Sequence, residues 1–206
     1  MKDEEAPAVE PDVTLYKKVF GDIEFDKLTR VIAFAPDEVI IAGRTIITKR
    51  QVAFYSESGQ SYRYSGTDHH PRLWPEILRV IKEKAEQITA RKYNACLANL
   101  YGNGEIGMGW HSDNERELGE NPAIASISFG AARKFSLRSL RSLKTTKQKW
   151  DYTLEHGDLL LMHGNSQQLF EHTLRTQKNV NNPRINLTFR FNLPLGKSPE
   201  KGNRND

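Results

Sequence analysis

The sequence lacks the features on which several classes of protein depend. Its 206 residues include a single cysteine, Cys96, which excludes a disulfide framework within the chain and a zinc site built from several thiolates. No stretch approaches the roughly 18 consecutive apolar residues that a membrane-spanning helix needs. Residues 1–5 are mostly charged and lack the apolar core of a secretory signal. We therefore expect an intracellular protein with no membrane partner, in the cytoplasm or the nucleus according to its source.

The composition is that of an ordinary globular domain with polar ends. Hydrophobic residues make up 37% of the chain, and a chain of this length buries well over half of its unfolded surface without a disulfide or a structural metal. Residues 1–12 are acidic and contain proline, and residues 196–206 are rich in glycine, lysine and asparagine. We expect disordered tails at 1–12 and 196–206, a single folded domain over 13–195, and a monomer.

Charge is unevenly distributed along the chain. Residues 1–12 contain one lysine and five acids, so the rest of the chain is more basic than the net charge of +4 indicates. The segment 133–149 contains no acid and carries these basic residues: Arg133, Lys134, Arg138, Arg141, Lys144, Lys147 and Lys149. Such a run predicts contact with a polyanion, although a solvated basic face explains it equally well.

The periodicity of apolar residues indicates many strands and few helices. Apolar residues repeat at helical spacing over 75–89, with Pro75 in the first turn, and a shorter helix is predicted over 26–32. Residues 39–47 are predicted to form a hairpin with its tip at 42–44. Further strands are predicted over 61–65, 93–101, 106–111, 123–129, 134–139, 151–154, 158–163 and 184–192. So many short strands exclude a doubly wound parallel sheet and predict a mainly β fold with flanking helices (α+β), an antiparallel sandwich or jelly roll.

Two predicted strands carry polar residues in alternation with apolar ones. In the segment 184–190, one face of an extended strand carries only polar side chains: Arg184, Asn186, Thr188 and Arg190. In the segment 93–101, Asn99 and Tyr101 share a face with Tyr93. A half-exposed strand with its polar face in water would give the same pattern. If both polar faces point inward, they surround a cavity suited to a small dicarboxylate.

A metal site is the hypothesis that best explains His111 and Asp113. The two residues are two positions apart and project from the same side of an extended segment. With a distant histidine they would form a facial triad that leaves three positions of Fe(II) open. The candidates for the third ligand are His69, His70, His156, His163 and His172. We favour His172, because its segment resumes an extended pattern, and we keep His163 as the competing candidate.

These elements together resemble the AlkB family of Fe(II)- and 2-oxoglutarate-dependent dioxygenases. The resemblance is carried, in chain order, by Asn99-x-Tyr101, His111-x-Asp113, Ser126-Ile127-Ser128-Phe129-Gly130, His172 and Arg184-x-Asn186-x-Thr188-x-Arg190. It spans residues 35–193, and the segments 61–66 and 113–118 resemble in particular the branch of human AlkB homologues two and three. The resemblance implies a double-stranded β-helix (jelly roll) and the repair of alkylated nucleobases by oxidative demethylation.

The resemblance implies a role for each matching residue. The ligands of Fe(II) would be His111, Asp113 and His172. The site for 2-oxoglutarate, which reacts with dioxygen, would be formed by Asn99, Tyr101, Arg184, Asn186, Thr188 and Arg190. The planar guanidinium of Arg190 would bind the distal carboxylate through two parallel hydrogen bonds, and Tyr101 would donate another.

The resemblance also implies a pocket for the substrate base. Its candidate residues are Tyr62 and Tyr64, with His111 as the opposite stacking face and Asn114 or Glu115 near the polar edge of the base, although Tyr62 and Tyr64 could be core aromatics instead. Arg44, at the hairpin tip, is a further candidate for substrate contact, where it could reach a phosphate or partly fill the gap left by a flipped base. The implied bases are 1-methyladenine and 3-methylcytosine, because tyrosine faces and a nearby carboxylate favour a positively charged ring.

Two departures from the branch bear on the form of the substrate. The hairpin tip Ala42-Gly43-Arg44 lacks the aromatic wedge of the homologue specialised for duplexes, and Asn114 stands where the branch usually has aspartate. We therefore expect alkylated DNA as the partner, preferably single-stranded, with RNA as a further candidate. The alternatives are an RNA or protein demethylase with the same iron core, and a nucleic-acid-binding module without catalysis.

Overall fold

The computed structural model describes residues 9–41, 43–59, 61–64, 67–140 and 148–193. Most of the two expected tails, residues 1–8 and 196–206, therefore lies outside the described residues. Residues 9–12, which we expected to belong to the acidic tail, contact the folded body. The backbone N–H of Asn165 donates to the Asp12 carboxylate at 2.9 Å, and Val9 packs against a buried apolar cluster.

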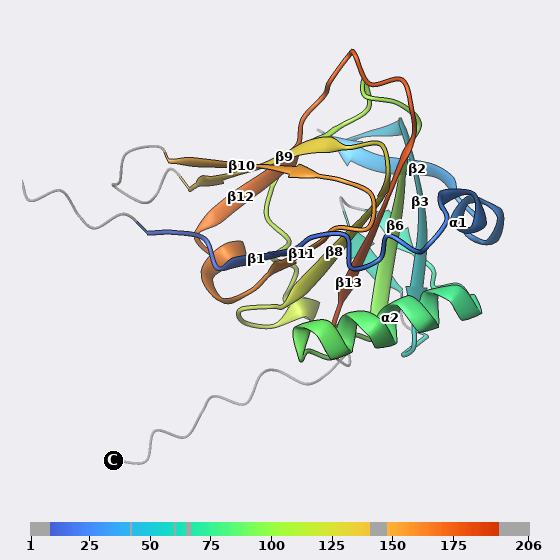
Figure 1. Cartoon of the computed structure of the whole chain (residues 1–206), viewed down its shortest axis with the longest axis horizontal. Coiled ribbons are helices and arrows are strands. Elements are labelled where there is room, and N and C mark those ends of the chain that lie inside the picture. Colours follow the sequence, from blue (N-terminus) through green and yellow to red (C-terminus); the bar gives the residue numbers. More distant parts are fainter. Residues whose placement is uncertain (1–8, 42, 60, 65–66, 141–147, 194–206) are drawn as a thin grey trace, which may run out of the picture.

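Two antiparallel sheets, formed by strands distant in sequence, face each other (Figure 1). The larger sheet has the strand order β1 (Val13–Tyr16), β11 (Leu159–Met162), β8 (Ile124–Gly130), β13 (Arg184–Arg190), β6 (Ala95–Tyr101), β3 (Arg44–Ser56) and β2 (Ala35–Ile41). The smaller sheet has the order β10 (Lys149–Leu154), β9 (Arg133–Ser139), β12 (Phe170–Leu174) and β7 (Met108–His111). A short hairpin joins β4 (Tyr62–Tyr64) to β5 (Thr67–His69). This arrangement confirms the predicted jelly roll.

Two helices cover the outer face of the larger sheet. They are α1 (Phe25–Val31) and α2 (Glu76–Thr89), close to the predicted ranges, although Pro75 caps α2 instead of lying in its first turn. The buried residues of α2, which include Leu78 and Ile81, belong to one apolar cluster with side chains of the central strands. Figure 1 shows α2 running across the larger sheet. Among the described residues, no helix has the length and apolar character needed to cross a membrane.

The central strand β13 places its polar residues inside the jelly roll. All seven of its residues are buried, which excludes a half-exposed strand with its polar face in water. Its apolar side chains, Ile185, Leu187 and Phe189, belong to the core beneath α2. Its polar side chains point the other way and line a cavity between the two sheets. The strict alternation of the sequence therefore separates a helix-facing core from a polar interior.

Tyr93 does not share the inner face with Asn99 and Tyr101, contrary to expectation. Strand β6 begins only at Ala95, and the chain before it turns toward α2. The hydroxyl groups of Tyr93 and Thr89 are hydrogen-bonded at 2.9 Å, and Tyr93 belongs to the core beneath the helices. The alternation rule fails here because it applies only within the strand.

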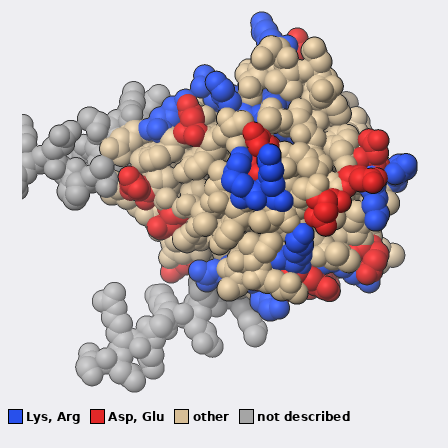
Figure 2. All heavy atoms as spheres, in the orientation of Figure 1, with Lys and Arg blue, Asp and Glu red and all other residues tan. Residues whose placement is uncertain are grey.

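The basic run 133–149 is not the continuous phosphate-binding surface that its sequence indicates. Arg133 is only 1% exposed and donates hydrogen bonds to backbone carbonyl groups of Asn103, Gly104, Ile106 and Arg175. Arg138 is paired with Glu171 and Lys149 with Asp151, whereas Lys134 is exposed. Residues 141–147, which contain the other three basic residues, lie outside the described residues. Figure 2 shows charges of both signs interspersed on one face of the molecule.

Replacing Arg133 tests its structural role. We expect Arg133→Met to lower the free energy of unfolding by about 3 kcal/mol or more, because it leaves several buried carbonyl groups without a donor. Exposed Lys134 gives the matched control, and Lys134→Met should change the stability by less than about 0.5 kcal/mol. Urea unfolding of both variants measures the difference. Equal, small losses for both would show that Arg133 is an ordinary surface cation.

Candidate functional site

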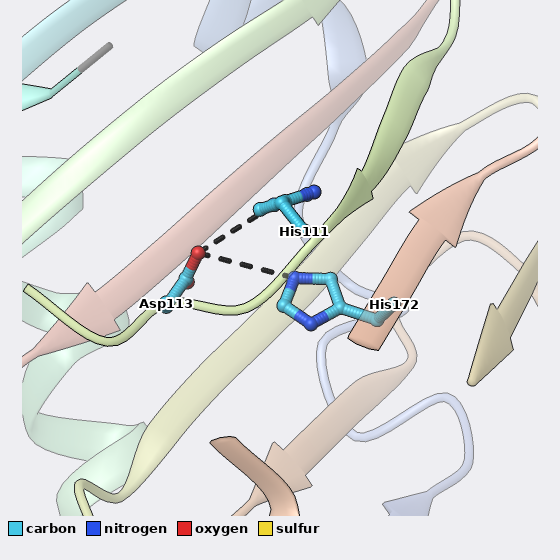
Figure 3. A group of neighbouring side chains, drawn as sticks. All are labelled: His111, Asp113 and His172. Carbon is cyan, nitrogen blue, oxygen red and sulfur yellow. Dashed lines mark ion pairs between the residues drawn. The ribbon is translucent and has the colours of Figure 1, made fainter. Parts of the chain in front are cut away.

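His111, Asp113 and His172 come together between the two sheets. In the pairing of β7 with β12, His111 lies directly opposite His172, and their ring centroids are 4.2 Å apart. Oδ1 of Asp113 lies 3.5 Å from Nε2 of His111 and 3.9 Å from Nε2 of His172 (Figure 3). One ligand atom from each residue lies within 4.8 Å of the others, so a single metal ion could contact all three.

Neighbouring groups hold both imidazole rings in orientations that suit metal binding. Nδ1 of His111 donates to the carbonyl oxygen of Gly109 at 2.8 Å, so the lone pair that can bind a metal is on Nε2. His172 is 4% exposed, and its ring stacks on the ring of Phe135 with the two centroids 5.3 Å apart. Nε2 of His172 faces Asp113. The two rings therefore present the same nitrogen toward one point.

The charges around the triad favour metal-binding protonation states. Burial of Asp113 raises its pKa. The Arg190 guanidinium and the two histidines lower the pKa by more than burial raises it, so the pKa lies below its usual value. Burial and the neighbouring His111 lower the pKa of His172 to about 3. Near neutral pH the carboxylate is therefore charged and the His172 ring is neutral, as metal ligands must be.

All six residues predicted for the cosubstrate line the cavity that contains the triad. They come from two neighbouring strands, in which Asn99 is paired with Asn186 and Tyr101 with Arg184. Oδ1 of Asn99 and Nε of Arg184 are buried and have no hydrogen-bond partner among the described residues. Buried polar atoms are rarely left without a partner, so these two atoms fit a polar ligand in the cavity.

Arg184 is a buried cation in the wall of the cavity. It is 2% exposed, and Nη2 donates to the Ser128 hydroxyl at 2.9 Å, yet no carboxylate of the described residues pairs with it. Burial lowers its pKa to about 10, which keeps it charged at neutral pH. A buried cation requires a counter-charge, and a ligand carboxylate supplies one.

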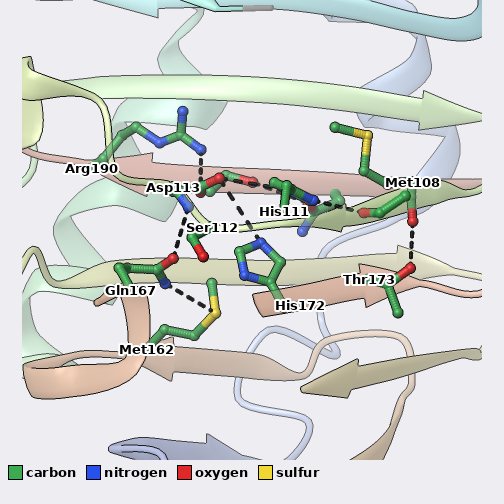
Figure 4. Close-up of polar contacts among 12 residues, drawn as sticks. Met108, His111, Ser112, Asp113, Met162, Gln167, His172, Thr173 and Arg190 are labelled. Carbon is green, nitrogen blue, oxygen red and sulfur yellow. Dashed lines mark hydrogen bonds and ion pairs between the residues drawn. The ribbon is translucent and has the colours of Figure 1, made fainter. Parts of the chain in front are cut away.

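Arg190, which the resemblance implies would bind the distal carboxylate, lies beside the metal-binding residue Asp113. Its Nη2 donates to Oδ2 of Asp113 at 2.8 Å (Figure 4). Arg184 is six residues away at the other end of the same strand, roughly 20 Å along the backbone. The charge of Arg190 is thus already paired with Asp113, whereas no carboxylate of the described residues pairs with Arg184.

Of the residues predicted to contact the substrate, Arg44, Asn114 and Glu115 lie outside this cavity, and the side chains of Tyr62 and Tyr64 lie outside the described part of the structure. Arg44 is exposed at the start of β3, and exposed Asn114 lines a separate polar groove with Gln168 and Glu171. Glu115 is partly buried but does not line the metal cavity. The backbone of Tyr62 and Tyr64 forms β4, and their side chains lie outside the described residues.

The other histidines are not brought to the triad. Nε2 of His163 lies 3.4 Å from the Thr14 hydroxyl, and Nδ1 of His156 accepts from the backbone N–H of Gly130. His70 contacts Ser61, and His69 lies 3.8 Å from the carboxylate of Asp37. Among the described residues, the cluster with metal-ligand spacing contains His172 and not His163.

Sequence reasoning missed two residues that the structure places at the site. Arg50 of β3 lines the cavity, is 5% exposed and is paired with buried Asp37. Gln167 contacts Asp113 directly. Val52, two residues after Arg50, shares a face of β3 with it and is paired with Asn99, whose side chain faces the cavity. An extended β3 could therefore have indicated that Arg50 faces inward. No pattern in the sequence singles out Gln167.

Comparisons with known proteins agree with this geometry. The model of the 2OG-Fe(II) oxygenase superfamily matches residues 37–190. DNA oxidative demethylase ALKBH2 of Mus musculus is 34% identical over 193 residues, which cover 88% of this chain and 81% of that protein. This chain belongs to the AlkB family of 2OG-Fe(II) oxygenases.

Two further matches extend the comparison. Alpha-ketoglutarate-dependent dioxygenase alkB homolog 3 of Homo sapiens is 37% identical over 153 residues, which cover 70% of this chain and 52% of that protein. The solved structure of OsALKBH1 matches with a TM-score of 0.58 at 18% identity, over 89% of this chain and 100% of that one, and supports the fold. The family resemblance and the use of Fe(II), 2-oxoglutarate and dioxygen are thus confirmed.

Proposed function

We propose that this AlkB-family dioxygenase removes N-linked methyl groups from nucleobases in DNA, with 1-methyladenine and 3-methylcytosine as its substrates. The observation that carries the proposal is the His111, Asp113 and His172 triad in the wall of a cavity whose far cation, Arg184, lacks a carboxylate partner among the described residues. The names of the ALKBH2 relatives, DNA oxidative demethylase, support the choice of substrate.

The chain's residues would place the reactants. When bound, Fe(II) with 2-oxoglutarate and dioxygen would supply the oxidant that hydroxylates the methyl group, and the hydroxymethyl adduct would then lose formaldehyde and leave the unmethylated base in the strand. Arg184 and Tyr101 would hold the distal carboxylate, because a guanidinium and a phenol both donate to it. Arg190 keeps the Asp113 carboxylate charged and oriented.

The substrate panel that tests the proposal consists of matched oligonucleotides. Formaldehyde release is measured with 1-methyladenine or 3-methylcytosine in single-stranded DNA, duplex DNA and RNA, and with a methylated peptide as control. We expect the highest rates with DNA. Release from RNA or peptide alone would favour the alternative demethylases, and binding that is indifferent to iron, without formaldehyde, would favour a non-catalytic module.

The form of the DNA gives a further prediction. Flipping a base out of a duplex costs a few kcal/mol, so without an aromatic wedge we expect single strands to be repaired faster by about tenfold or more. Gly43 turns with φ at +76°, and Arg44 beside it is exposed; Ala42 lies outside the described residues. Ala42→Phe should therefore improve duplex repair more than single-strand repair. Equal wild-type rates without any gain in Ala42→Phe would contradict this.

A further inference from the structure

The position of Asp113 is fixed by side chains and not by a sheet. Strand β7 ends at His111, and its pairing with β12 comprises only the pairs His111–His172 and Met108–Leu174, with a shift between them. Asp113 therefore lies in an irregular segment, where backbone rotation would move its carboxylate. Contacts from other elements must hold it, because a metal site requires ligands fixed to a fraction of an ångström.

Gln167 makes the contact that holds the Asp113 backbone. Its Oε1 accepts the backbone N–H of Asp113 at 2.8 Å (Figure 4). An N–H group only donates, so the amide oxygen must face it, and Nε2 then lies 3.5 Å from Sδ of Met162. Gln167 is 2% exposed. Its side chain is therefore buried between the metal-binding segment and the cavity wall.

The element that carries Gln167 is itself anchored. Gln167 ends the 3-10 helix η2 (Gly164–Gln167), which leads directly into β12 and its ligand His172. Asp12 accepts the backbone N–H of Asn165 at 2.9 Å, and the Ser166 hydroxyl donates to the carbonyl oxygen of His163 at 2.6 Å. One anchored segment thus contacts Asp113 and leads into the strand that supplies His172.

We propose that Gln167 is a positioning residue that sets the metal affinity of the site. Its amide oxygen fixes the backbone of Asp113, while Arg190 fixes Oδ2 of the same residue from the other side. Together they direct Oδ1 toward the two histidines. Contacts of this kind typically contribute 10- to 100-fold to metal affinity.

The deciding experiment measures Mn²⁺ binding to the metal-free protein by electron paramagnetic resonance, without 2-oxoglutarate or a base. We expect Gln167→Met, which keeps the length but removes the acceptor, to raise the dissociation constant by about 10- to 100-fold. Gln168→Met, the same change at the exposed neighbouring position, should leave it unchanged. A purely structural role would lower the melting temperature of metal-free Gln167→Met but leave Mn²⁺ affinity intact, and that result would overturn the proposal.

Two further variants separate the acceptor from packing. Gln167→Glu keeps an oxygen that accepts the Asp113 N–H and should bind Mn²⁺ nearly as well as the wild type. Gln167→Asn withdraws the amide by one methylene group and should lose affinity as Gln167→Met does, which provides the test if the methionine variant fails to fold. Wild-type affinity in Gln167→Asn would contradict the proposal. Because no nucleobase is used, failure here is distinct from failure of the proposed substrate.

Discussion

Replacing His172 by alanine should abolish turnover while the fold is retained. The site would keep only His111 and Asp113, and two protein ligands bind Fe(II) poorly. Because a bound metal stabilises the transition state of such a reaction by several kcal/mol, we expect the rate of 2-oxoglutarate decarboxylation to fall by about 1000-fold or more. Succinate formation and the circular dichroism spectrum measure activity and fold together.

His163 provides the matched control, because it is the competing candidate to His172 in the sequence. It lies beside Thr14, away from the triad, so His163→Ala should keep wild-type turnover. Full activity in His172→Ala combined with its loss in His163→Ala would move the third ligand to His163 and contradict the observed arrangement.

Replacing Arg184 should weaken cosubstrate binding without weakening the metal site. Loss of one partner of a buried charge pair costs about 2–5 kcal/mol, so Arg184→Met should raise the Michaelis constant for 2-oxoglutarate by about 30-fold or more. The cosubstrate-free protein should not lose stability, because the variant removes a buried cation that has no carboxylate partner among the described residues. Titration of 2-oxoglutarate and a thermal melt measure the two effects.

Arg190 gives the contrasting variant. Arg190→Met leaves the Asp113 carboxylate buried without its cation, so Mn²⁺ affinity should fall together with cosubstrate binding. If Arg190→Met raised only the Michaelis constant and Arg184→Met changed neither quantity, the distal carboxylate would belong to Arg190, as the sequence first indicated.

Local periodicity explains why much of the interior could be predicted from the sequence. The alternation of 184–190 has the period of a strand, and its central place in the sheet buries both faces. The pair His111 and Asp113 is predicted from the same rule, but β7 ends at His111, and contacts from Gln167 and Arg190 hold Asp113 in place. The burial pattern of 184–190 could be predicted because it depends on backbone geometry within a few residues.

Other features depend on tertiary contacts that periodicity does not report. Arg133 and Lys134 are adjacent and equally basic, yet one is buried against four carbonyl groups and the other is exposed. The two arginines of β13 share a face of the strand, and their tertiary contacts distinguish them: Arg190 donates to Asp113, and Arg184 donates to the Ser128 hydroxyl. Gln167 lies in a short 3-10 helix whose contact with Asp113 spans 54 residues.

The most direct test of the proposed reaction is its stoichiometry. The wild-type protein, loaded with Fe(II), is given 2-oxoglutarate, dioxygen and a single-stranded oligonucleotide containing one 1-methyladenine, and succinate, formaldehyde and adenine are counted together. Coupled oxidative demethylation predicts equal amounts of all three, and none of them in His172→Ala. Succinate formed without formaldehyde while the methylated base remains intact would show that N-methylated DNA is not the substrate.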